Sequence, residues 1–385
     1  VITGNQAGQG GGVGLARLGF AFNRMLTGSA LTFMPGPEPA LAGASRFTDL
    51  AGNDLYARAA KAGNLPGPEL LICYDANPVY ALPAGVRDQL GLASIPCKIA
   101  FSSFLDETAL AADLVLPLPL GLERLDDVYT PFGSGRVVYS LCPQIIKPLH
   151  GGRPPAEILL AALTALGADM RGADGQTVNS LENLLRIKAA QLGADYRSLL
   201  RGEAFTASPR DLPGESLADV AQDLSRYSRA IPPPDKLAAA FPAGELSLAP
   251  VSRLATGTAA SGIPPYSARI ISSRELQGNA LFAQVNSGTA RGLGLKNGQR
   301  ARLSARSGGA ATPTVSLPVR VAISEGIMDN VIGLPLGYGH AGFDEFSRGK
   351  GVNGLDLYSL TAEGRDSAGE PSYCLLAAGL ELKGV

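Results

Sequence analysis

The chain has 385 residues, of which 45% are hydrophobic and 17% charged, and its formal net charge is −1 at pH 7. This composition supports packed cores in two or three domains and excludes a chain that is disordered throughout. The balanced charge argues against extended contact with nucleic acid or an anionic membrane. No apolar run reaches the ~18 residues of a membrane span, so we expect membrane association only through a partner.

The chain starts at Val1, and no charged leader precedes an apolar core. We therefore expect no signal peptide and infer a segment of a longer protein. The four cysteines stand at 73, 97, 142 and 374, and the two histidines at 150 and 340. We expect Cys73 and Cys97 to be small buried hydrophobes within strands. The wide cysteine spacing disfavours a disulfide framework or an iron–sulfur cluster, and two histidines exclude a His-rich metal site within the chain.

Residues 3–14 read TGNQAGQGGGVG. Glycine-rich backbone can approach a ligand closely and present free N–H groups, and a helix over 15–25 would offer its N-terminus to an anion. The candidate binding residues here are Gly4, Asn5, Gly10 and Gly11, with a plain surface loop as the alternative. Residues 26–66 read as loop with one short helix over 54–62.

The segment 71–127 alternates short apolar runs with helical patterns. It predicts strands over 71–74, 95–101 and 113–117 and helices over 86–92 and 106–112, which is the pattern of an open parallel α/β sheet. Because Pro78 restricts Asn77 to extended backbone, we expect the chain to turn there without passing directly into a helix. Ligands bind at the carboxyl ends of such strands, which are here residues 75–78, 102–108 and 117–123.

Polar residues at these ends are candidate cofactor contacts: Asp75, Asn77, Pro78, Ser102, Ser103, Glu107, Thr108 and Asp113. Glu107 could bind a nucleotide hydroxyl or simply favour a helix start, and Asp113 could accept from a ribose or guanine or cap backbone N–H groups. Glu123 and Arg124 read as an internal ion pair. Asp126 and Asp127 read as a solvated turn and not as paired catalytic carboxylates.

Helical patterns follow over 157–166, 179–201 and 217–227, each with one apolar stripe for core packing. Residues 231–265 form a linker rich in proline. From 268 the pattern is β-rich and typical of an all-β barrel. The expected strands are 269–272, 281–285, 299–304, 315–323 and 327–332, with a short helix and an Asn-Gly turn within 286–298.

Two polar residues of this C-terminal part are further candidates. His340 follows Gly337-Tyr-Gly and could be a loop histidine bonded to backbone, or, as the family resemblance described below implies, a donor to a pterin or phosphate. Asn353 can donate and accept at once, which suits a pterin or guanine edge, although it could also stabilise its own turn.

Three pieces recur in order: YDANPVYALP, FSSFLDETALAADLVLPLPLGLER and, near the C-terminus, VNSGTARGLGLKNGQRARLSARSG. Together they resemble the molybdopterin oxidoreductase (dimethyl sulfoxide reductase) family, in the C-terminal portion of its large subunit. The barrel loop is most similar to polysulfide-reductase-like and quinone-reductase (Qrc-like) membrane complexes. The resemblance implies an α/β cofactor-binding domain over 1–150, a helical region and linker over 151–245, and a double-psi-like β-barrel over 246–385. The helices between 155 and 230 have no counterpart in it.

The resemblance implies an oxidoreductase that binds molybdopterin guanine dinucleotide, with molybdenum or tungsten, and supports electron transfer in a respiratory complex. The family's metal ligand and iron–sulfur motif are not visible, so a cluster could lie only in upstream or partner sequence. The implied partners are an iron–sulfur electron-transfer subunit and a membrane anchor, in the periplasm. The alternative is a metal-free scaffold subunit that keeps the fold without catalysis. An ordinary nucleotide-dependent enzyme is disfavoured because there is no P-loop or full dinucleotide fingerprint.

Overall fold

The computed structural model describes residues 68–129, 137–168, 170–171, 175, 177–207, 245–252, 262–306, 315–365 and 371–385. The predicted glycine loop with Gly4, Asn5, Gly10 and Gly11 lies outside the described residues. So do the helices expected over 15–25, 54–62 and 217–227.

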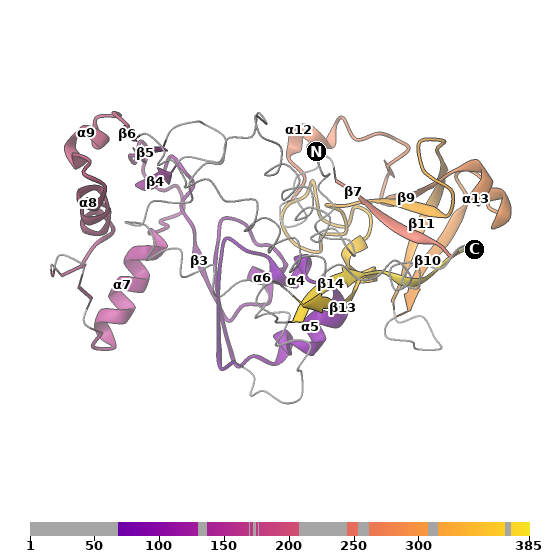
Figure 1. The fold of residues 1–385 in the computed structure, drawn as a ribbon, viewed down its shortest axis with the longest axis horizontal. Helices are drawn as coiled ribbons and strands as arrows, with labels where there is room; N and C mark the ends of the chain where they lie inside the picture. Colours follow the sequence, from indigo (N-terminus) through magenta and orange to yellow (C-terminus); the bar gives the residue numbers. More distant parts are fainter. Residues whose placement is uncertain are drawn as a thin grey trace, which may run out of the picture.

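A three-stranded parallel sheet lies at the centre of the molecule (Figure 1). Its order is β1 (Leu70–Tyr74), β2 (Cys97–Ser102) and β3 (Leu114–Pro117). The connections carry α4 (Pro78–Ala81), α5 (Ala84–Gln89), the 3-10 helix η3 (Leu92–Ser94) and α6 (Glu107–Leu110). The predicted open parallel α/β sheet is therefore confirmed.

Two local predictions in this sheet are wrong. Helix α4 begins directly at Pro78, with Asn77 as its N-cap at φ −117°. The steric restriction acts on Asn77 alone, and proline suits the first helical position because its missing N–H would be unbonded there anyway. Cys73 is buried as expected, but Cys97, the first residue of β2, is exposed.

A second part joins a small antiparallel sheet to three helices. The sheet has the order β4 (Asp126–Tyr129), β5 (Val137–Cys142) and β6 (Phe205–Ala207). The helices are α7 (Pro155–Ala165), α8 (Leu181–Leu192) and α9 (Tyr196–Leu200), which gather at one end of the molecule (Figure 1). Gly193, at φ 76°, ends α8 and divides the helical pattern predicted over 179–201.

The carboxylates at the start of β4 are not the solvated turn that the sequence predicts. Asp126 pairs with Arg124, and Asp127 pairs with Lys188 of α8. Arg124 therefore does not pair with Glu123, contrary to the prediction. Glu123 is instead buried and accepts hydrogen bonds from backbone N–H groups.

The C-terminal part is a mixed sheet of seven strands. Six follow the order β15-β10-β11-β9-β12-β7, and β8 pairs with β9. The strands are β7 (Ser247–Val251), β8 (Leu276–Gln277), β9 (Ala280–Val285), β10 (Arg300–Arg306), β11 (Val315–Ile323), β12 (Val331–Pro335) and β15 (Ala378–Gly384). Beside them lie α12 (Pro265–Ala268), α13 (Ser287–Gly292), the 3-10 helix η5 (Gly354–Leu357) and the hairpin of β13 (Ser359–Arg365) and β14 (Pro371–Leu376).

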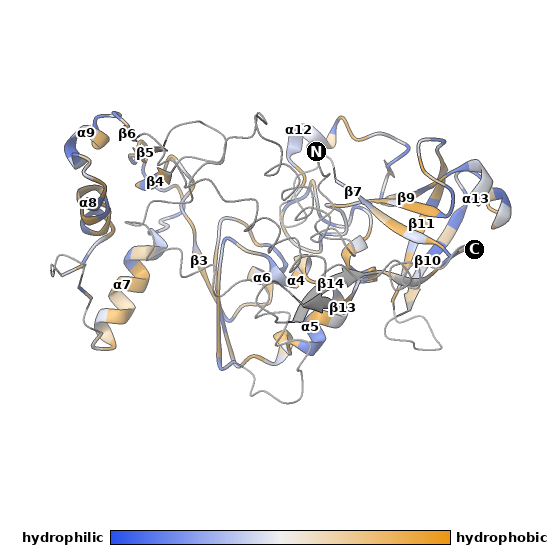
Figure 2. Cartoon of the chain, in the orientation of Figure 1, coloured by the Kyte–Doolittle hydropathy of each residue, from blue (hydrophilic) through white to orange (hydrophobic). Residues whose placement is uncertain are grey.

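Apolar side chains of β9, β10, β11 and β12 form the largest core of the described residues, and Figure 2 shows the hydrophobic stretches along β9 and β11. Within these residues the strand path runs openly from β15 to β7, so the predicted closed, double-psi-like barrel is not confirmed. The prediction of a strand over 269–272 is wrong, because the residues after Pro264 form α12 and a turn. The predicted linker contains β7, and the strand expected at 327 begins only at Val331.

Candidate functional site

The tip of β1 is tied to the tip of β2 through Asn77. Its side-chain amide donates to Glu107 Oε2 at 2.6 Å, and its carbonyl oxygen accepts from both the backbone N–H and the hydroxyl of Thr108 at 3.1 and 2.8 Å. The Thr108 hydroxyl also accepts from Val79 N–H at 3.1 Å. Asn77 is buried, so both ends of its amide are bonded away from water.

Glu107 carries the network from the sheet to the C-terminal part. Its Oε1 accepts from the backbone N–H groups of Ala341 and Gly342 at 2.7 and 2.9 Å and lies 3.2 Å from His340 Nδ1. Burial alone would raise the pKa of Glu107, but the hydrogen bonds from His340, Gly342 and Asn77 outweigh it and lower the pKa to about 2. Glu107 is therefore a carboxylate and only accepts, so His340 Nδ1 carries a proton.

His340 is enclosed by aromatic side chains and is 1% exposed. Its ring stacks on Tyr80, with centroids 3.8 Å apart and planes at 15°, and Phe343 approaches it at 5.4 Å. The other ring nitrogen, Nε2, is buried and has no hydrogen-bond partner. Among the predicted binding residues that the structure describes, this is the buried polar side-chain atom left unsatisfied.

Glycines give the histidine loop its close fit. Gly339 has φ +84°, and a Cβ there would lie 2.1 Å from the Asn353 nitrogen. A Cβ on Gly342 would lie 2.7 Å from the Leu105 carbonyl oxygen. Asn353 itself caps η5 by accepting from Leu355 N–H and donates to the Tyr80 carbonyl at 2.9 Å.

We call Asn77, Tyr80, Glu107, His340 and Asn353 the Glu107 joint. It brings together four residues that the sequence analysis predicted and one, Tyr80, that it missed. The Tyr80 hydroxyl donates to the Tyr338 carbonyl at 2.7 Å. A buried tyrosine two residues after the Asn-Pro turn gave no chemical signal in the sequence, because its partner is a backbone oxygen 258 positions away.

Two further contacts beside the joint were also missed. Arg87 of α5 forms an ion pair with Asp356 at 3.0 Å. Phe343 N–H donates to the Leu105 carbonyl at 2.8 Å, and the Phe343 ring stacks on Phe104. The α/β sheet and the C-terminal part therefore share a continuous bonded contact.

The other predicted residues make local bonds. Ser102 donates to the Phe104 carbonyl and Ser103 to the Leu118 carbonyl. Asp113 accepts from Lys98 N–H at 2.7 Å, as the capping alternative predicts. Asp75 has φ 46° and donates its N–H to the Phe101 carbonyl, and Pro78 opens α4.

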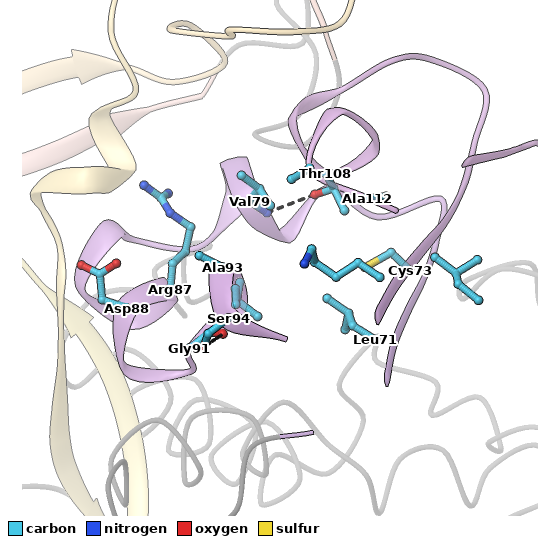
Figure 3. Close-up of a pocket in the computed structure, with 14 residues that line it drawn as sticks. Leu71, Cys73, Val79, Arg87, Asp88, Gly91, Ala93, Ser94, Thr108 and Ala112 are labelled. Carbon is cyan, nitrogen blue, oxygen red and sulfur yellow. Dashed lines mark hydrogen bonds between the residues drawn. The ribbon is translucent and has the colours of Figure 1, made fainter. Parts of the chain in front are cut away.

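A cavity of about 530 Å³ lies on the sheet face beneath α4 and α5 (Figure 3). Leu71 and Cys73 of β1 form one wall, and Val79 and Thr108 stand where it approaches the joint. The cationic side chains that line the cavity are already bonded. Arg87 donates to the Leu82 carbonyl and pairs with Asp356, and Lys98 donates to the Ile95 carbonyl. Of the predicted binding residues it contains only Thr108, so it is separate from the site that the sequence indicates.

Within the described residues, no group of three or more His, Cys, Asp and Glu side chains could hold a metal ion. Across the same part of the chain, no helix has the length and hydropathy to cross a membrane.

Comparison with known proteins gives a close relative in sequence and one in fold. No family model matches the chain. It is 41% identical over 374 residues to the menaquinone reductase molybdopterin-binding-like subunit of Nitratidesulfovibrio vulgaris, covering 94% of this chain and 50% of that protein. It also resembles the solved structure of acetylene hydratase from Pelobacter acetylenicus, with a TM-score of 0.56 and 16% identity, over 86% of this chain and 46% of that one. The chain thus spans about half the length of its curated relative.

Proposed function

Because this chain belongs to the molybdopterin oxidoreductase family, we propose that it is the molybdopterin-fold part of a subunit in a membrane-associated quinone reductase complex. The support is its similarity to a subunit of a menaquinone reductase, most of this chain being matched. In that complex this chain would lie in the periplasm, beside an iron–sulfur electron-transfer subunit and a membrane anchor, as the sequence resemblance implies.

The bonding of the Glu107 joint favours the scaffold version of this role. The amide of Asn77, the carboxylate of Glu107 and the hydroxyl of Thr108 bond to one another and to the histidine loop. A guanine dinucleotide that used these atoms would have to replace bonds already made within the chain, and each buried group left unpaired would cost ~1–3 kcal/mol. These three residues do not fit the cofactor that the resemblance implies. Their bonds hold the sheet to the C-terminal part.

A second version, in which the subunit binds molybdopterin guanine dinucleotide with molybdenum or tungsten, is favoured by one atom. His340 Nε2 is buried without a partner. In the neutral ring, with the proton on Nδ1, Nε2 would accept from a pterin N–H, and in the charged ring it would donate to a pterin or phosphate oxygen. In that version the metal and pterin would supply the electron transfer, while this chain would contribute His340 as an orienting contact.

The two versions are separated by analysing the intact purified complex. We expect a complex with all its subunits but without stoichiometric pterin by fluorescence after oxidation, and without molybdenum or tungsten by elemental analysis. Stoichiometric pterin bound to this subunit would overturn the scaffold version. A His340→Phe variant that lost that pterin while keeping the complex intact would establish the second version.

A further inference from the structure

Five large aliphatic side chains surround a hollow of about 610 Å³ on the surface, where the loop after β3 meets the segment after β5. They are Leu120 and Leu122 on the loop after β3, and Ile145, Ile146 and Leu149 on the segment after β5. We call these five residues the apolar groove. Each is between 46% and 76% exposed, and none belongs to the hydrophobic cores of the described residues.

The backbone of the groove is held in place by a buried carboxylate. Glu123 is 6% exposed, and its Oε2 accepts from Leu120 N–H at 3.0 Å while its Oε1 accepts from Leu149 N–H at 3.2 Å. The N–H groups of Ile145 and Ile146 both donate to the Leu122 carbonyl, at 3.0 and 3.1 Å. The two loops are thus fixed to each other by polar bonds beneath side chains that point to solvent. A contiguous apolar patch on a preorganised backbone is typical of an interaction site.

The charge beside the groove is basic. Lys147 is exposed on the segment that carries three of the groove's aliphatic residues, and His150 is exposed on the same segment. The neighbouring acids are already engaged, Glu123 with backbone and Glu157 with Arg153 at 3.7 Å. The groove therefore matches an occupant that offers aliphatic side chains with acidic residues at their flank.

The concave shape favours a protein over a bilayer. A hollow of this volume accepts protruding side chains, as an apolar groove does when it binds an amphipathic helix. A membrane surface would instead be met by a convex apolar face lying in the interfacial plane.

We propose that the apolar groove docks an amphipathic helix from another subunit of the complex, with aliphatic residues on one face and acidic residues beside it. The inference deepens the proposed role as a subunit and rests on that role. It is independent of which version of the role, scaffold or cofactor-binding, is correct.

The test replaces Leu149 and Ile145, separately, by Asp in the intact complex, with Leu166→Asp as the control. Leu166, at the end of α7, is 82% exposed and lies outside the groove. We expect Leu149→Asp and Ile145→Asp to weaken binding of the neighbouring subunit by roughly tenfold or more, and Leu166→Asp to leave it within about twofold. The thermal midpoint of each isolated variant chain verifies that it folds.

A photocrosslinking residue at position 149 identifies the occupant. Crosslinking to an aliphatic segment with acidic neighbours in another subunit supports the proposal. Unchanged subunit binding in both groove variants overturns it, as does crosslinking to a segment without acidic residues. Binding of the chain to vesicles containing phosphatidylglycerol, lost in Leu149→Asp while subunit binding persists, would assign the groove to the membrane. Pterin content is measured in the same samples, so failure of the cofactor version is seen separately. If the wild-type chain purifies with no other subunit, the proposed complex itself fails.

Discussion

His340 meets Glu107 across 233 positions of the chain, with Nδ1 3.2 Å from the carboxylate oxygen. Glu107 begins α6 at the tip of the parallel sheet, and His340 lies on the loop after β12. The same carboxylate binds two successive N–H groups of that loop. A single half-buried anion therefore organises the contact between the α/β sheet and the C-terminal part.

Glu107→Gln is expected to destabilise the chain by ~2–4 kcal/mol. The new amide NH₂ group would have to face N–H donors or leave them unpaired, whichever way it is turned. Chemical denaturation measures the change in the free energy of unfolding. Glu157→Gln on α7 is the control, because its ion pair with Arg153 is exposed and worth under ~1 kcal/mol. Equal losses in the two variants would contradict the role of Glu107.

Gly339→Ala and Gly349→Ala form a matched pair on one loop. Both glycines have positive φ, +84° and +70°, so both variants carry the backbone cost of ~1 kcal/mol. Only at Gly339 would the Cβ meet another backbone, 2.1 Å from the Asn353 nitrogen, while nothing lies within 4 Å of the Cβ at Gly349. We expect Gly339→Ala to lower the thermal midpoint far more. Similar midpoints would show that the histidine loop does not pack closely on Asn353.

Stability should fall in acid because of Glu107. Its pKa is lowered from 4.5 in the unfolded chain to about 2 in the folded one, so its contribution is complete above pH 4.5 and lost as the pH falls towards 2. The contribution of Glu107 to the free energy of unfolding is on the order of 3 kcal/mol. Denaturation of wild type and Glu107→Gln across this window should give curves that converge at low pH. A constant difference between them would contradict the assignment.

Tyr80→Phe removes the hydroxyl that donates to the Tyr338 carbonyl and leaves the stacking on His340. We expect a loss of ~1–2 kcal/mol, since a buried carbonyl is left without this donor. Tyr266→Phe is the control, because that tyrosine is 87% exposed. A Tyr80→Phe variant as stable as the Tyr266→Phe variant would show that the hydroxyl contributes nothing.

Sequence patterns predicted the elements whose order depends on local signals. The three apolar runs that end at Asp75, Ser102 and Pro117 became the parallel sheet, and β9, β10 and β11 followed the C-terminal pattern. Closure of a barrel depends on pairing between distant strands, and the strand pattern alone did not determine it. Gly193 was read as part of a longer helix because one glycine is compatible with helical periodicity.

Convergence of the candidate residues was predictable, but their bonding was not. The strand-end rule brought Asn77 and Glu107 together, and the family resemblance added His340 and Asn353. Whether these side chains face a ligand or each other depends on distances between segments far apart in the sequence. The bonds of Glu123 could not be predicted for the same reason. The sequence predicts an ion pair with its neighbour Arg124, but Glu123 accepts a hydrogen bond from Leu149 N–H, which is distant in the sequence.

Glu107 and His340 join the two parts by bonding to each other. A double-mutant cycle of Glu107→Gln and His340→Phe, read as free energies of unfolding, measures that bond directly. We expect a coupling energy of ~1–3 kcal/mol between the two sites. Additivity within ~0.3 kcal/mol would contradict it, because the two side chains would then act independently.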